Sequence, residues 1–209
     1  IDKLPRGLIG SGKSIDELGF EVAKLFVDGE IPDVDLQKIV SETVNFPLPI
    51  IGVEKDVFSL ELWHGPTCAF KDVGGRFLAR CLEYFVKKSG DKITILVATS
   101  GDTGSAVAAG FLGVEGIDVV ILYPKGKVSK IQEQQLTTMG QNITTLEVDG
   151  TFDDCQAMVK RAFNDEELRS KINLSSANSI NVARFLPQSF YYFSSCLLYT
   201  SDAADDWFC

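Results

Sequence analysis

The chain of 209 residues contains a single histidine, His64, and this scarcity limits the chemistry that it can support. A metal centre built from several imidazole groups is excluded. The five cysteines are odd in number, widely spaced and without a Cys-x-x-Cys pair, which argues against a disulfide framework and against a zinc site. We therefore expect no metal ion, and unpaired thiols favour the reducing cytoplasm as the location.

Long apolar runs and basic clusters are also missing. The longest apolar run, Val119–Tyr123, is far shorter than the roughly 20 residues that a membrane-spanning helix needs. The 20 basic and 29 acidic side chains give a formal net charge of −9. An acidic surface repels phosphate backbones and anionic lipids, so neither nucleic acid nor a membrane is an expected partner. The 45% of hydrophobic residues is typical of a globular protein.

Residues 1–50 are expected to form a small helical segment. Apolar residues recur at helical spacing between Ser14 and Phe26, and a second helix is predicted over Asp35–Thr43. Pro47 and Pro49 end this pattern.

Residues 51–193 alternate between strand and helix patterns. The predicted strands are Phe58–Trp63, Ile93–Ala98, Val119–Tyr123 and Ile143–Val148, and the predicted helices are Val73–Lys87, Ser105–Leu112, Ser129–Met139 and Phe152–Phe163. Repeated alternation of this kind predicts an α/β domain with an open, mostly parallel sheet and helices on both of its faces.

Residues 194–209 differ from the rest of the chain in composition. They contain three Asp, no Lys or Arg, and two of the five cysteines, with no clear helix or strand pattern. Part of this tail resembles a translated sequencing adapter, so we expect it to be foreign to the natural sequence.

The segment Gly7–Ser14 matches the phosphate-binding pattern G-x-x-x-x-G-K-[ST]. That pattern binds nucleotides when a buried strand leads into the loop, and the sequence Ile-Asp-Lys-Leu-Pro-Arg before it does not predict one. The alternative is a helix that begins at Ser14, with Glu17 completing a capping box. Nucleotide binding stays open as a rival function of a different class.

The polar loop Thr99–Gly104 is a candidate binding site. It follows the predicted strand Ile93–Ala98 and precedes the helix predicted from Ser105. The N–H groups at a helix N-terminus attract anions, and ligands of parallel sheets bind at the carboxyl ends of strands. An ordinary polar turn is the alternative.

Lys71 is a candidate nucleophile. It follows the apolar residues Cys68, Ala69 and Phe70 at the start of a predicted helix, where desolvation and the helix dipole both disfavour the ammonium form. A neutral lysine can attack a carbonyl group. The two glycines after Val73 are costly in a plain helix and predict that another group approaches the backbone closely. The alternative is a surface lysine paired with Asp72.

Four segments, in the same order, resemble those of threonine synthases over residues 1–193. They are Leu62–Asp72, Ala98–Gly104, Leu122–Ser129, and Ser175–Asn181 with Arg184. Threonine synthases are pyridoxal-phosphate enzymes of fold type II, and they convert O-phosphohomoserine and water to threonine and phosphate. The resemblance therefore implies this fold, this cofactor and this substrate.

The resemblance also implies roles for individual residues. Lys71 would hold the cofactor covalently and then move protons on the substrate, with Phe70 and Asp102 beside the cofactor. The loop residues that would receive the substrate carboxylate are Thr99, Ser100, Gly101, Thr103 and Gly104.

For the substrate phosphate, the resemblance points to Lys127, Asn181 and Arg184. A departing phosphate needs cationic or N–H donors that strengthen as its charge develops. A threonine-synthase-like phospholyase would use the same lysine and substrate but release a keto acid and ammonia, and it is the alternative among enzymes.

Threonine synthases continue for about as long again as this chain. Their continuation carries the glycine-rich loop for the cofactor phosphate and the hydroxyl residue that faces the pyridine nitrogen. We therefore expect this chain to be a truncated form that binds the cofactor poorly by itself, and the oligomeric state stays open.

Overall fold

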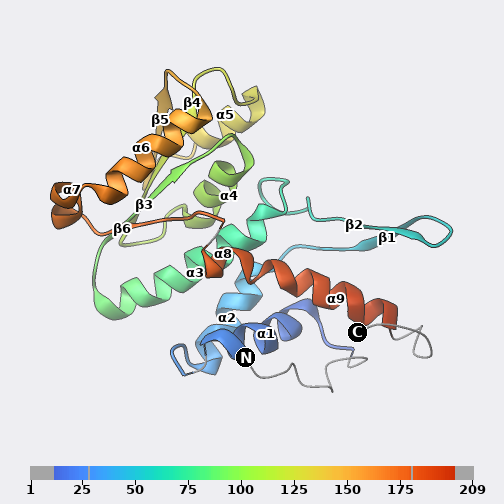
Figure 1. The fold of residues 1–209 in the computed structure, drawn as a ribbon. Coiled ribbons are helices and arrows are strands. Elements are labelled where there is room, and N and C mark those ends of the chain that lie inside the picture. Colours follow the sequence, from blue (N-terminus) through green and yellow to red (C-terminus); the bar gives the residue numbers. More distant parts are fainter. Residues whose placement is uncertain (1–11, 28, 180, 201–209) are drawn as a thin grey trace.

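Figure 1 shows a computed structural model that describes residues 12–27, 29–179 and 181–200. Most of the pattern Gly7–Ser14 lies outside the described residues. The helices are α1 (Ile15–Val27), α2 (Asp33–Thr43), α3 (Lys71–Ser89), α4 (Asp102–Phe111), α5 (Lys130–Thr137), α6 (Phe152–Asn164), α7 (Glu166–Lys171), α8 (Val182–Phe185) and α9 (Gln188–Thr200). The strands are β1 (Ile50–Glu54), β2 (Val57–Leu60), β3 (Ile93–Ala98), β4 (Ile117–Pro124), β5 (Ile143–Val148) and β6 (Leu174–Ser175).

Four strands form a parallel sheet in the order β5-β4-β3-β6. Strand β3 lies inside this sheet, paired with β4 along its whole length and with β6 through Thr94 and Ile95. Helices connect the successive strands, as parallel pairing requires. The predicted parallel α/β fold is confirmed.

Helices pack against both faces of the sheet. Ile95 and Val97 of β3 pack with Phe111 of α4 in one cluster, whereas Leu96, between them in the chain, packs with Cys155 of α6 in another. This alternation follows from the two-residue period of a strand. Figure 1 shows α6 and α4 on opposite sides of the strands. The expected cover of helices on both faces is therefore present.

A separate helical core joins both ends of the described chain. Val40 of α2, Phe77 of α3 and Phe190 of α9 belong to one buried cluster, and the rings of Phe77 and Phe190 meet edge to face with centroids 5.8 Å apart. The predicted helices of the N-terminal segment are present as α1 and α2. The domain boundary near residue 50 stays a prediction. Among the described residues, no helix is both long enough and apolar enough to cross a membrane.

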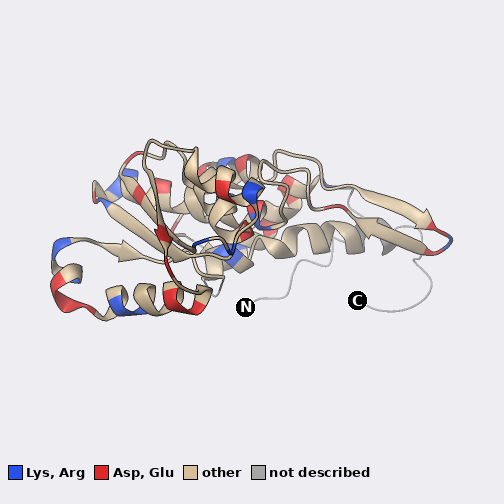
Figure 2. Cartoon of the chain, turned by 90° about the horizontal axis from the view of Figure 1, so that it is seen from above, with Lys and Arg blue, Asp and Glu red and all other residues tan. Residues whose placement is uncertain are grey.

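One predicted strand lies elsewhere in the fold. The pattern over Phe58–Trp63 predicted a strand of the parallel sheet, but β2 instead pairs with β1 in a separate antiparallel hairpin. Only Lys55 and Asp56 connect the two strands, and a connection this short cannot cross over to a parallel partner. Figure 2 shows the hairpin extending from the body, with charged residues gathered at its turn.

Residues 194–209 show no clear helix or strand pattern, but α9 extends into their first part, as far as Thr200. Extending a helix that has already formed costs much less than nucleating one. A helix that starts at Gln188 can therefore run on through residues with no pattern of their own. The origin of the tail stays a prediction.

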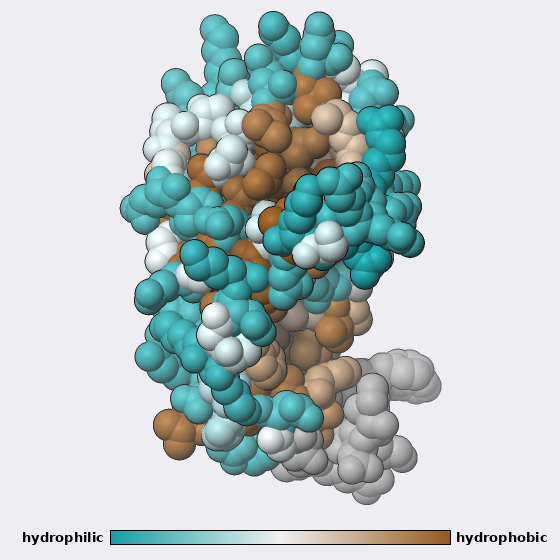
Figure 3. All heavy atoms as spheres, turned by 90° about the vertical axis from the view of Figure 1, so that its left-hand side faces the viewer, coloured by the Kyte–Doolittle hydropathy of each residue, from teal (hydrophilic) through white to brown (hydrophobic). Residues whose placement is uncertain are grey.

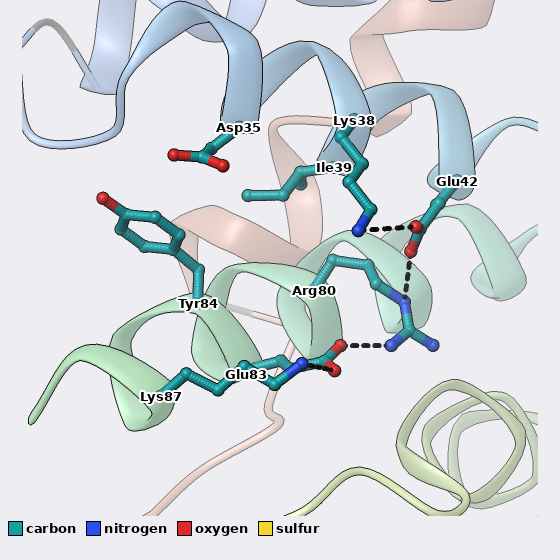
Figure 4. A pocket seen from close by; sticks show the side chains of 8 residues that line it. All are labelled: Asp35, Lys38, Ile39, Glu42, Arg80, Glu83, Tyr84 and Lys87. Atoms are coloured by element: carbon teal, nitrogen blue, oxygen red, sulfur yellow. Dashed lines mark hydrogen bonds and ion pairs between the residues drawn. The ribbon is translucent and has the colours of Figure 1, made fainter. Parts of the chain in front are cut away.

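Ion pairs connect α2 and α3. Glu42 of α2 lies 3.3 Å from Arg80 and 3.9 Å from Lys38, while Glu83 lies 2.6 Å from Lys87 and also pairs with Arg80. Figure 4 shows these side chains around a cavity of about 210 Å³. Because each carboxylate in this cluster is paired with basic side chains, we interpret the cluster as a structural link between the two helices.

Candidate functional site

Lys71 begins α3, as predicted, and its side chain is 28% exposed. Its Nζ lies 3.8 Å from Oδ2 of Asp102, at the start of α4, and 5.6 Å from the ring centroid of Phe70. The structure therefore brings together the three residues that the resemblance to threonine synthases assigned to the cofactor. They form a partly exposed group of an amine, a carboxylate and an aromatic ring.

Asp72 fixes the turn that leads into Lys71. Its carboxylate is buried and accepts hydrogen bonds from the N–H group of Thr67 at 2.9 Å and from the Thr67 hydroxyl at 2.6 Å. A Cβ atom on Gly65 would lie 2.5 Å from Asp72 Oδ2, so a larger residue there would displace this carboxylate. The alternative pairing of Lys71 with Asp72 is wrong, because adjacent residues of a helix point in different directions.

Gly74 and Gly75 permit two other helices to approach α3. A Cβ atom on Gly75 would lie 2.7 Å from the carbonyl oxygen of Ala106 in α4, and one on Gly74 would lie 2.4 Å from that of Arg184 in α8. The predicted close approach is therefore confirmed. What approaches is the protein's own backbone, which brings the start of α4 next to Lys71.

The loop after β3 is shorter than predicted. Helix α4 begins at Asp102 rather than Ser105, so the last three residues of the polar segment form its first turn. The buried hydroxyl of Thr99 accepts hydrogen bonds from the N–H groups of Gly101 at 3.0 Å and Gly104 at 2.8 Å. These bonds satisfy N–H groups at the helix start and allow the helix to begin early. Ser100 is exposed beside them.

Gln132, in the first turn of α5, is a residue of this site that sequence reasoning missed. Its Nε2 donates to Asp102 Oδ1 at 2.6 Å. Its amide also lies against Gly101, where a Cβ atom would be 2.5 Å from the Gln132 Cδ. The capping-box spacing from Ser129 to Gln132 was the signal that could have placed this side chain at a helix start.

A cavity of about 160 Å³ opens at the carboxyl end of β3, between the polar loop and α6. Thr103, a predicted site residue, lines it together with Ser176 and Asn178. Gln156 and Lys160 of α6 also line it, and sequence reasoning missed both. The sequence predicted their helix over Phe152–Phe163, but no signal in it separated these two residues from solvated ones.

Asn181 and Arg184 hold the turn between β6 and α8. The Asn181 side chain accepts from the N–H group of Ala183 at 3.0 Å and donates to the carbonyl of Ser176 at 3.1 Å. Arg184 is buried, and its Nη1 donates to the carbonyl of Ala177 at 2.6 Å. Burial lowers the pKa of Arg184, and its Nε has no hydrogen-bond partner among the described residues.

Lys127 is exposed in the turn after β4. The structure gives its side chain no ion pair within the described part of the chain. The phosphate-binding roles of Lys127, Asn181 and Arg184 stay predictions. The His64 Nε2 lies 2.7 Å from Oε2 of Glu61. In the described ranges, no cluster of three or more His, Cys, Asp or Glu side chains is placed to hold a metal ion.

Comparison with known proteins places the chain in a family of enzymes. The family model described as pyridoxal-phosphate dependent enzyme matches residues 42–186. The threonine synthases of Haemophilus influenzae and Escherichia coli are 54% and 52% identical over 169 and 176 residues. These matches cover 81% and 84% of this chain but only 39% and 40% of the two relatives. The chain thus spans about 40% of the length of the curated relatives that it matches.

Solved structures agree with this result. The pyridoxal-phosphate-bound threonine synthase of Brucella melitensis matches with a TM-score of 0.86 and 42% identity, over 95% of this chain and 44% of that one. The Escherichia coli threonine synthase matches with a TM-score of 0.83 and 47% identity, over 90% and 44%. A diaminopropionate ammonia lyase, 14% identical with a TM-score of 0.52, supports the fold alone. The chain therefore belongs to the family of pyridoxal-phosphate-dependent enzymes and is a homologue of threonine synthases.

Proposed function

We propose that the protein to which this chain belongs is a threonine synthase that converts O-phosphohomoserine and water to threonine and phosphate. The observation that carries this proposal is the group formed by Lys71, Phe70 and Asp102 at the carboxyl end of a parallel sheet. The relatives that are 54% and 52% identical to the chain over the matched residues are threonine synthases, which supports the same assignment.

The residues at the site fit pyridoxal phosphate. Lys71 supplies a primary amine for the cofactor aldehyde, and 28% exposure leaves it reachable. When bound, the cofactor acts as an electron sink for the substrate carbons. Lys71 would hold the cofactor and move protons at its Nζ, and the Asp102 carboxylate 3.8 Å away supplies a counter-charge when Lys71 is an ammonium group.

The first turn of α4 suits the substrate carboxylate. The first N–H groups of a helix have no partner within the helix. The Thr99 hydroxyl accepts hydrogen bonds from the N–H groups of Gly101 and Gly104. The N–H groups of the other loop residues are therefore left to bind an anion, and the exposed Ser100 hydroxyl lies beside them. Binding of the substrate phosphate by Lys127, Asn181 and Arg184 remains part of the proposal.

The test is a Lys71→Ala variant of the whole enzyme. We expect it to lose the covalent bond to the cofactor, detected by borohydride reduction and mass spectrometry of the Lys71 peptide, and to lose phosphate release. Lys125→Ala is the matched control, because Lys125 is exposed on the turn after β4. Retained covalent binding in Lys71→Ala would reject the proposal.

Product analysis separates the two enzyme alternatives. A threonine synthase yields threonine and phosphate, whereas a phospholyase yields a keto acid, ammonia and phosphate. The nucleotide-binding hypothesis predicts instead that Lys13→Ala abolishes binding of a nucleotide to the chain. Binding of ATP that depends on Lys13 would revive it.

We also infer that residues 1–209 by themselves are inactive and that the enzyme works in the cytoplasm. The short span relative to the threonine synthases supports the first inference, and the odd number and wide spacing of the cysteines in the sequence support the second. Cofactor titration of the isolated chain checks the first, and saturable binding with full turnover would contradict it.

A further inference from the structure

The contact between Gln132 and Asp102 joins three elements at the site. Gln132 lies in α5, Asp102 begins α4, and Lys71 begins α3. The Gln132 amide donates to Asp102 Oδ1 at 2.6 Å, while Asp102 Oδ2 lies 3.8 Å from Lys71 Nζ. The two oxygens of one carboxylate thus face two different partners.

The orientation of the Gln132 amide follows from its other contacts. Its Oε1 accepts from the N–H group of Ser129 at 3.2 Å and from the Ser129 hydroxyl at 3.1 Å. A backbone N–H group can only donate, so the amide oxygen must face Ser129. The NH₂ group must then face Asp102, and a donor at this place stabilises the ionised form of a carboxylate.

Gly101 completes the arrangement. The Gln132 amide lies over this residue, where any Cβ atom would come within 2.5 Å of it. Gly101 also has φ +143°, a conformation that other residues rarely adopt. Because Gly101 has no side chain, it leaves the space that the Gln132 amide fills.

We propose that Gln132 is a positioning residue, which holds the Asp102 carboxylate so that its second oxygen faces Lys71. The meaning of this inference for catalysis rests on the proposed function, but the contact can be tested without the cofactor. Among the described residues, Asp102 is the charged group that the structure pairs with Lys71, since the nearby Asp72 is bonded to Thr67.

The experiment measures how readily Lys71 reacts with acetic anhydride as a function of pH, in the cofactor-free chain, by mass spectrometry of the Lys71 peptide. Only the neutral amine reacts. Gln132→Met lacks the hydrogen-bond donor, so the Asp102 carboxylate is free to turn to solvent. Lys71 then loses its counter-charge, its ammonium form is less stable, and the pH midpoint of labelling falls. Gln132→Glu keeps the capping box but adds a negative charge, so the midpoint rises. We expect shifts of about 0.3 to 0.7 pH unit, as for a partly exposed ion pair.

Matched controls separate positioning from general effects. Gln134→Met and Gln134→Glu make the same changes at an exposed position of α5 and should leave the midpoint unchanged. Asp102→Asn removes the counter-charge and should lower the midpoint at least as far as Gln132→Met does. Far-ultraviolet circular dichroism verifies folding, and Gln132→Ala replaces the Met variant if that variant unfolds.

The labelling midpoint of the Gln132→Met variant decides the test. A Gln132→Met midpoint within 0.1 pH unit of the unmodified chain, together with a lowered midpoint in Asp102→Asn, overturns the proposal. In the whole enzyme we expect Gln132→Met to shift the pH dependence of the visible absorbance of the lysine-bound cofactor, and to lower kcat more than it changes KM. A failure to bind cofactor would count against the proposed function, and the labelling result would stand.

Discussion

Cys68 and Cys81 lie close together in the chain but in different surroundings. Cys68 is exposed in the turn before Lys71, whereas Cys81 is buried between α3 and the N-terminal helices. Burial raises the pKa of Cys81 from 9.0 to about 12, because a thiolate is poorly solvated there.

This difference makes the stability of the chain depend on alkaline pH. Unfolded Cys81 loses its proton near pH 9.0 and folded Cys81 near 12, so between these values the unfolded state binds fewer protons and the free energy of unfolding falls. The loss is at most about 1.4 kcal/mol per pH unit. Urea unfolding at pH 8 and pH 10.5 should show a smaller loss in Cys81→Ala than in the unmodified chain. Cys68→Ala should lose as much as the unmodified chain, and equal losses in all three would contradict this prediction.

Thr99 gives a second prediction for a single residue. Its buried hydroxyl bonds the N–H groups of Gly101 and Gly104, and Thr99→Val keeps the shape but leaves these donors without the bonds. We expect the free energy of unfolding to fall by about 1 to 3 kcal/mol, measured by urea unfolding. Thr99→Ser keeps the hydroxyl and should lose less. A Val variant as stable as the unmodified chain would show that the loop does not need the hydroxyl.

Among the elements, α3 and α4 pack through glycine. Gly75 lies against the carbonyl of Ala106, and a Cβ atom on Gly110 would lie 2.9 Å from the Gly75 backbone. An exposed helical glycine replaced by alanine usually stabilises a helix by about 1 kcal/mol.

For Gly75→Ala we expect the opposite sign. The new Cβ atom would lie 2.7 Å from a backbone oxygen, so the two helices must separate, and overpacking of this kind costs about 1 to 3 kcal/mol. Thermal unfolding followed by circular dichroism measures the change. A variant with a higher midpoint temperature than the unmodified chain would disprove the close contact.

The alternation of elements was predictable because strand and helix periods differ in the sequence. The strands β3 and β5 have the predicted bounds, and Lys71 stands at the predicted helix start. Gln132 could not be assigned to the site from its local pattern, because its contact with Asp102 joins residues 30 positions apart. The prediction that β2 belongs to the parallel sheet was likewise wrong, since a strand pattern does not show with which other strand it pairs.

On the scale of the whole molecule, apolar side chains remain at the surface. Ile51, Val53 and Val57 of the β1–β2 hairpin are 45%, 65% and 46% exposed. Figure 3 shows further apolar side chains between polar ones, on the side where Figure 1 places α6 and α7. Uncovered surfaces of this kind favour association between molecules.

We therefore expect the isolated chain to self-associate as its concentration rises. Val53→Lys places a charge on a hairpin strand, which should oppose edge-to-edge pairing and lower the apparent mass in sedimentation velocity. Val34→Lys, at an exposed apolar position of α2, is the matched control and should change the mass little. If both variants behave alike, the hairpin is not the surface through which the chains associate.

The pairing of β3 with β6 has a consequence for biosynthesis. Ile95 of β3 pairs with Ser175, eighty residues later in the chain. A ribosome adding about 5 to 20 residues per second makes that stretch in roughly 4 to 16 seconds. During this interval one edge of the strand that carries the site loop has no partner, so the nascent chain presents a binding surface to chaperones before its enzyme site can assemble.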